Sequence, residues 1–194
     1  MISDARKVVY SASQSVFFDA NVWLSLYAPP SGVNNYWKGE YSKVLSLIVA
    51  GNAPVLIDAT VISEYINRYC RIEFQAYEEY AHPQSSRTFK DFRIQDLDTY
   101  RPIADSAAEC VREMLEIPSI RRVNDNFADR DIRAMLDDFS SGENDWNDLQ
   151  IADLCRQNDC ALLTNDADFE DSDIEVLTCN KRLLQNAASF QRRK

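Results

Sequence analysis

Acidic residues stand where short apolar segments give way to helices or turns, near both ends of this 194-residue chain. Asp19 directly follows the apolar run 16–18, Asp166 comes two residues after the apolar segment 160–164, and Asp148 opens an apolar helix-like segment. In α/β folds, ligands bind at the carboxyl ends of the strands. Carboxylates that meet there repel one another and raise their own pKa values without a cation. The pattern therefore predicts a divalent metal ion held by oxygen ligands.

Asp148 is the most informative of these acids. Apolar residues stand three, four and seven positions after it, so Asp148 shares the inward face of its predicted helix. A carboxylate on the core side is costly unless it is paired or coordinated. Asp145 and Asn147 are better candidates for capping the helix, which leaves Asp148 in need of a partner.

The other acids each have a structural alternative. Asp19 could cap the helix that follows it, and Glu64 could complement the dipole of the helix in which it lies. Asp166 and Asp168 could be ordinary loop acids, beside a Thr164 that bonds to the local backbone or orients the carboxylates. Their joint placement at one sheet edge is what favours a site. With Mg²⁺ or Mn²⁺ bound there, a water molecule of lowered pKa could attack a phosphodiester.

Composition removes several other chemistries. The single histidine, His82, precedes Pro83 in a polar stretch that predicts a surface loop, which argues against histidine-based zinc sites and Ser-His-Asp systems. Only four glycines are present and no glycine-rich phosphate loop occurs, which argues against nucleotide cofactors. The net charge of −10 argues against a broad non-specific nucleic-acid binder but is compatible with a nuclease whose acidic cleft holds metal.

The cysteines and the apolar runs indicate the compartment. Five cysteines, an odd number with no CxxC pair, predict reduced and mostly buried thiols in a cytoplasmic protein. No apolar run is long enough to span a membrane, and residues 1–15 lack the apolar stretch of a secretory signal.

Alternation of strands and helices predicts an α/β fold with a parallel sheet, in a single domain over residues 1–194. The expected strands are 15–19, 54–58, 160–164 and 174–178, and the expected helices are 21–27, 36–49, 60–74 and 148–158.

Residues 75–140 break this alternation. They are rich in charge, show no convincing strand, and contain helix-like patches at 102–115 and 127–139, so we expect a helical insertion over about 75–140. The basic residues of the insertion are expected to form solvated faces; they are Arg87, Lys90, Arg93, Arg121 and Arg122. The C-terminal tail, residues 191–194, is expected to fray.

Four segments, in this order, resemble the PIN domain, and within it the VapC-type toxins of bacterial toxin–antitoxin systems. They are residues 18–24 (FDANVWL), 62–65 (ISEY), 147–152 (NDLQIA) and 163–169 (LTNDADF). The last segment is the strongest, with an Asp eighteen residues before its own first Asp.

The resemblance implies a Rossmann-like three-layer α/β/α sandwich with a Mg²⁺- or Mn²⁺-dependent endoribonuclease site. By motif, the catalytic and metal-binding acids would be Asp19, Glu64, Asp148 and Asp166, with Asp168 as an extra ligand; Thr164, Asn21 and Asp145 would support them. It also implies an RNA substrate, a cognate antitoxin and a homodimer. The aromatic residues Trp23, Tyr27, Tyr36 and Trp37 are candidate dimer contacts, although a place in the core is favoured for them.

Two other readings stay open. A DNA nuclease or a phosphatase could use the same kind of metal site. The haloacid-dehalogenase pattern is absent, because it requires an Asp two residues after Asp19, where this chain has Asn21. A catalytically idle PIN-like module could instead serve protein binding. Substitution of Asp148 by asparagine would abolish activity at a catalytic site and leave a pure binding role largely intact.

Overall fold

The computed structural model describes residues 1–84, 86–125, 127–142, 145–169 and 173–191. Within them, six strands form one parallel sheet in the order β1-β6-β5-β2-β3-β4. The strands are β1 (Ile2–Asp4), β2 (Ser15–Phe18), β3 (Val55–Ile57), β4 (Ile120–Arg122), β5 (Cys160–Leu163) and β6 (Val176–Thr178). The expected parallel sheet and all four expected strands are confirmed.

The inner strands carry the sheet because they are apolar on both faces. β3, β5 and β6 are buried along their whole length, as expected for parallel strands covered by helices on both sides. β2 pairs with β5 from Ser15 opposite Cys160 to Phe18 opposite Leu163. Both strands therefore end at the same edge, immediately before Asp19 and Thr164.

Two edge strands depart from the sequence-based expectation. β4 lies inside the segment expected to hold no strand, so that expectation was wrong: Ile120–Arg122 pairs in parallel with β3. Its Arg121 and Arg122 are exposed, so the strand lacks the apolar pattern that marks a buried strand. β1 was not expected either, because its three residues are only half-buried at the opposite edge.

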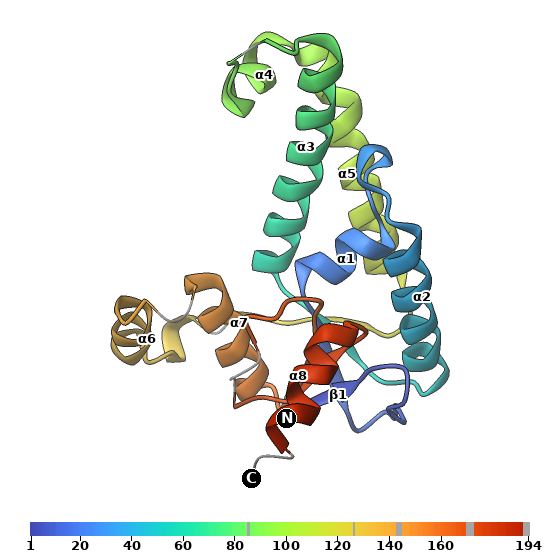
Figure 1. Ribbon diagram of the computed structural model, residues 1–194, viewed down its shortest axis with the longest axis vertical. Coiled ribbons are helices and arrows are strands. Elements are labelled where there is room, and N and C mark those ends of the chain that lie inside the picture. The colour runs from blue at the N-terminus through green and yellow to red at the C-terminus, as the bar shows by residue number, and fades with distance from the viewer. Residues whose placement is uncertain (85, 126, 143–144, 170–172, 192–194) are drawn as a thin grey trace.

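The helices are α1 (Ala20–Leu26), α2 (Asn35–Ala50), α3 (Ala59–Ala81), α4 (Phe89–Gln95), α5 (Leu97–Glu116), α6 (Ile132–Ser140), α7 (Trp146–Gln157) and α8 (Lys181–Gln191), with short 3-10 turns η1 (Pro30–Gly32) and η2 (Phe127–Asp129). With the sheet they form the expected three-layer α/β/α sandwich. α3 and α5 run side by side away from the sheet, with α4 at their far end, and form an arm (Figure 1).

The arm accounts for most of the expected insertion. α3 continues past the expected end at residue 74 as far as Ala81, and His82 ends it in an exposed position. Arg87 was expected on a solvated face but is half-buried, with ion pairs to Glu78 and Asp96, because the turn before α4 folds back onto α3. The tail 192–194 lies outside the described residues.

The core contains the expected apolar residues. Trp23, Phe17 and Tyr65 are fully buried, and Trp23 is therefore not available as a dimer contact, whereas Tyr36 is about half exposed. All five cysteines are free and four of them are buried, as predicted. None of the helices in the described ranges is long and apolar enough to cross a membrane.

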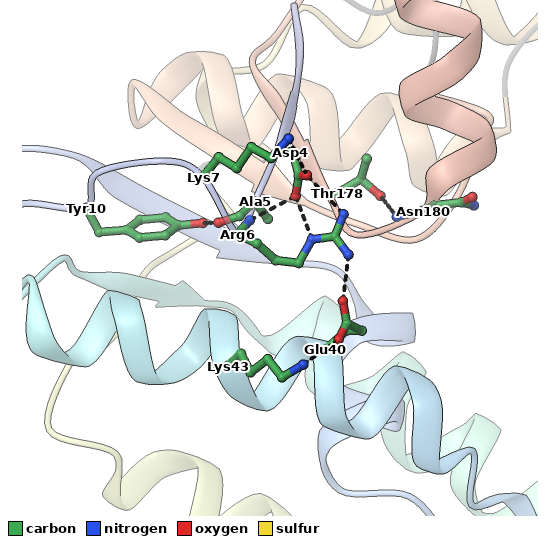
Figure 2. A network of polar contacts seen from close by, with 9 residues as sticks. All are labelled: Asp4, Ala5, Arg6, Lys7, Tyr10, Glu40, Lys43, Thr178 and Asn180. Atoms are coloured by element: carbon green, nitrogen blue, oxygen red, sulfur yellow. Dashed lines mark hydrogen bonds and ion pairs between the residues drawn. The ribbon is translucent and has the colours of Figure 1, made fainter.

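A polar network ties the β1 edge to α2 (Figure 2). The Arg6 guanidinium donates to Asp4 through Nε at 2.7 Å and to Glu40 through Nη1 at 2.6 Å. Lys43 completes the chain with a 2.8 Å contact to Glu40. Because Glu40 directly precedes Tyr41, the network also fixes the part of α2 that faces the end of β5.

Candidate active site

Asp19 and Thr164 meet where β2 and β5 end. The Thr164 hydroxyl donates to Asp19 Oδ2 at 2.7 Å. Asn21 Nδ2 donates to the same Oδ2 at 2.5 Å and to Thr164 Oγ1 at 3.1 Å. Asp19 also caps α1 by accepting from the Asn21 backbone, so its capping role and its place in the site hold together. Two sequence-predicted supporting residues, Thr164 and Asn21, thus orient one buried carboxylate.

The loop after β5 is held by the same residues. The Asp166 backbone N–H donates to Thr164 Oγ1 at 3.0 Å, and the Asn165 backbone N–H donates to Asn21 Oδ1 at 3.0 Å. The Asp168 backbone N–H reaches Asp166 Oδ1 at 3.3 Å. Asp166 and Asp168 are both exposed, so their carboxylates stand at the mouth of the site beside the buried Asp19.

Two supporting residues were missed from the sequence. The Tyr41 hydroxyl donates to the Thr164 carbonyl at 3.3 Å and to Asn165 Oδ1 at 3.2 Å. Asn180 Nδ2 donates to the Asn165 carbonyl at 3.1 Å. Tyr41 looked like part of an apolar helix face and gave no signal. Asn180 follows β6 at the same sheet edge, so the rule that found Asp19 could have found it.

Asp148 lies in the first turn of α7, which Asp145 caps by accepting from the Asn147 N–H at 2.9 Å. Burial, and to a smaller extent the negative charges of Asp145, Asp166, Asp168 and Asp19, together raise the pKa of Asp148 to about 7. A half-buried carboxyl group surrounded by acids is thus favoured in its neutral form.

Asp19 experiences the same effects. Burial is the largest cause that raises its pKa, the hydrogen bond from Thr164 opposes it, and the charges of Glu64 and Asp166 add to the rise. The charges of the predicted acids therefore reach one another across the sheet edge: Glu64 and Asp166 act on Asp19, and Asp19 acts on Asp148. These acids therefore influence one another through their charges.

Glu64 lies on α3 at the margin of this group. Its carboxylate accepts from Arg68 Nη1 at 3.2 Å, one helical turn further along. Glu64 and Asn147 both line an inner recess and an outer groove between α3 and the start of α7. Glu64 therefore lies between α7 and an open groove.

Arg130, just after η2, was also missed. It is buried and lines the inner recess with Glu64 and Asn147. Its Nε lies 3.3 Å from Asp153 Oδ2 and its Nη1 donates to Gln150 Oε1 at 3.5 Å, so it packs the insertion against the helix that carries Asp148. A lone arginine in a charge-rich segment offered no sequence signal.

A divalent cation suits the chemistry of this donor set. The donors are hard carboxylate oxygens, and the pKa values of Asp19 and Asp148 are raised first by burial and then by neighbouring negative charge, which a cation would neutralise. Among the described residues, no three histidine, cysteine or acidic side chains lie close enough together to hold an ion. Coordination by Asp19, Glu64, Asp148, Asp166 and Asp168 therefore stays a prediction.

Thr164→Val is expected to destabilise the protein by about 1–3 kcal/mol, because it leaves the buried Asp19 Oδ2 without its hydroxyl donor and the Asp166 N–H without its acceptor. The isosteric change keeps the volume, so the loss measures the hydrogen bonds. Thr164→Ser retains the hydroxyl and is the matched control. Urea unfolding of both variants measures the effect; equal stability of Thr164→Val and wild type would contradict it.

Comparison with known protein families identifies the class of protein. A family model of the PIN domain matches residues 16–175, and the chain belongs to that family. PIN domains are generally nucleases and typically use divalent metal ions. No curated protein matches the chain.

Among solved structures, the chain is similar to one in the crystal structure of VapBC2 from Rickettsia felis bound to a DNA fragment from their promoter. The sequence identity is 12%, the TM-score is 0.51, and the match covers 84% of this chain and 97% of the other. At this identity, the similarity concerns the fold.

Proposed function

We propose that this PIN-domain protein is an endoribonuclease that uses Mg²⁺ or Mn²⁺. The observation that carries the proposal is the mutual effect of the acids: Asp19 and Asp148 have raised pKa values because burial and neighbouring carboxylates act on both. Such groups at the carboxyl edge of a parallel sheet are candidates for catalysis.

Each residue has a role in the proposed reaction. Asp19 is held in one orientation by Thr164 and Asn21, and so offers a fixed ligand oxygen. Asp148 would give up its proton when a cation binds, and Glu64 and Asp166 would supply the remaining carboxylate ligands. A bound Mg²⁺ or Mn²⁺ would lower the pKa of a water molecule and neutralise charge on the phosphate.

Comparison of substrate classes tests the proposal and separates it from the alternatives. The purified protein would be incubated with a pool of structured RNAs, with DNA of matched sequence and with p-nitrophenyl phosphate, in Mg²⁺, Mn²⁺ or EDTA. We expect internal cleavage of RNA that requires metal. Preferred cleavage of DNA would favour a DNA nuclease, release of p-nitrophenol a phosphatase, and no reaction by folded protein a binding module.

We further propose that the enzyme acts as the toxin of a type II toxin–antitoxin pair and forms a homodimer. The support is the fold similarity to a chain of the VapBC2 structure, together with Tyr36 as an exposed candidate contact. Expression of the wild type should arrest bacterial growth, and co-expression of a cognate antitoxin should relieve the arrest. Arrest that persists in Asp148→Asn would contradict a catalytic toxin.

A further inference from the structure

An open groove runs along the first half of α3, next to the start of α7. Its volume is about 510 Å³, and it is lined by Ala59, Thr60, Ser63, Glu64, Asn67, Arg68, Arg71 and Asn147. This volume falls within the roughly 300–1,000 Å³ of small-ligand pockets, which suits a few nucleotides of a single strand rather than a duplex.

The groove starts at the candidate active site and leads away from it. Glu64, Arg68 and Arg71 are spaced four and three residues apart, so they share one helix face. At 1.5 Å of rise per residue, Arg68 lies about 6 Å and Arg71 about 10 Å along the axis from Glu64. The two arginines therefore stand at successive distances from the acid.

The lining is suited to phosphate groups. Two arginines face a single carboxylate, so the groove is locally positive although the chain carries a net charge of −10. Amides and hydroxyls, from residues such as Asn67 and Ser63, add neutral hydrogen-bond donors. Most contacts between proteins and nucleic acids are made to phosphate and sugar by side chains of these types.

Each of the two arginines has one contact that positions it and remains exposed enough to bind a phosphate group. Arg68 pairs with Glu64 across one turn, and about half of its side chain is exposed, so this pair is weak and solvent-screened. Arg71 is exposed, and its Cζ lies 4.9 Å from the centroid of the Phe89 ring. The contact is made by the Arg71 guanidinium itself, and it positions this group beside the groove that Arg71 lines.

We propose that this groove binds the backbone of single-stranded RNA on one side of the scissile bond, with Arg68 and Arg71 contacting successive phosphates. The inference rests on the proposed nuclease function and names the path of its substrate. It gives the arm a role, because α3 carries the strand from the acids toward α4.

The test is the salt dependence of binding to a short labelled single-stranded RNA, measured by fluorescence anisotropy in EDTA so that no cleavage occurs. Each lost phosphate contact lowers the slope of log K against log salt by about 0.7 for a single strand. The double variant Arg68→Gln/Arg71→Gln should therefore lose about 1.4 from the slope, and bind about 25-fold more weakly near 0.1 M salt.

Two matched variants separate charge at this place from other effects. Arg101→Gln/Arg112→Gln makes the same charge change on α5, where Arg112 pairs with Glu109 much as Arg68 pairs with Glu64, and it should bind like the wild type. Arg68→Lys/Arg71→Lys keeps the charge and should keep the slope. Melting temperatures establish that all variants are folded.

The outcomes distinguish the two proposals. If the wild type cleaves RNA but the glutamine variant keeps the wild-type slope, the groove proposal is overturned and the nuclease stands. An equal loss in the α5 control would also overturn it, since the effect would then be one of total charge. If the slope falls as expected but no cleavage occurs with any metal, the groove binds RNA and the proposed catalytic function fails.

Discussion

Asp148→Asn is expected to lower kcat/KM for RNA cleavage by at least about 10³-fold, because metal ions contribute several kcal/mol to charge stabilisation in such transition states. Burial and four neighbouring acids raise the pKa of Asp148 to about 7 in the absence of a cation. Asparagine keeps the size of the side chain but removes the charge that would hold an ion. Initial rates over a range of RNA concentrations measure the change.

Asp159→Asn is the matched control for this variant. It removes the same charge from an exposed position at the other end of α7, at a backbone φ of 46° that asparagine tolerates well. Asp159 lies just before β5, at the edge of the sheet opposite the candidate site. Wild-type rates are expected for this control. A folded Asp148→Asn variant with wild-type rates would refute the assignment of Asp148.

The second large effect of Asp148→Asn is on the stability of the metal-free protein. Here the substitution is expected to be favourable, whereas it is expected to be unfavourable for activity. The pKa of Asp148 is about 7 in the folded protein, against a model value of 3.8, so the folded state binds the proton more tightly than the unfolded state. The contribution of Asp148 to the free energy of unfolding is then most favourable below pH 4 and declines as the pH rises from about 4 to 7. Above pH 7 the full penalty of an ionised Asp148 is present.

Asp148→Asn is therefore expected to stabilise the metal-free protein above pH 7, by about 1–2 kcal/mol after allowance for the solvent screening of a half-exposed group. The gain should disappear near pH 4, where the native carboxyl group is already neutral. Urea unfolding in EDTA at several pH values measures this dependence. Destabilisation at pH 8, or a gain that does not change with pH, would contradict the electrostatic account of the site.

The polar residues at the end of β2 and β5 could be predicted from the sequence because they directly follow the strands that position them. Asp19 and Thr164 follow apolar strands, and neighbouring parallel strands end together, so their contact at 2.7 Å follows from the strand pattern. Asp148 was identified from its inward face, and its raised pKa reflects the burial that this placement implies. These signals are local, one strand or one helix turn in length.

Other parts of the site depend on contacts between distant segments. Tyr41 reaches the Thr164 carbonyl only because α2 packs beside the end of β5, and Arg130 comes from the segment between β4 and α6. β4 was missed because an edge strand of three residues with two exposed arginines has no apolar period. The arm was foreseen as helical, but nothing in its periodicity indicated that α3 would line a groove at Glu64.

The most direct test of the central claim, that the acids of this sheet edge jointly bind a divalent cation, is a calorimetric titration of Mn²⁺ into the metal-free protein. Wild type, Asp19→Asn and Asp148→Asn would be compared at one pH. We expect saturable binding to the wild type, weakened at least about 10-fold in each variant, since even residues that only support a metal site change affinity by about 10- to 100-fold. Equal affinity in all three proteins, or no binding to folded wild type, would contradict the claim.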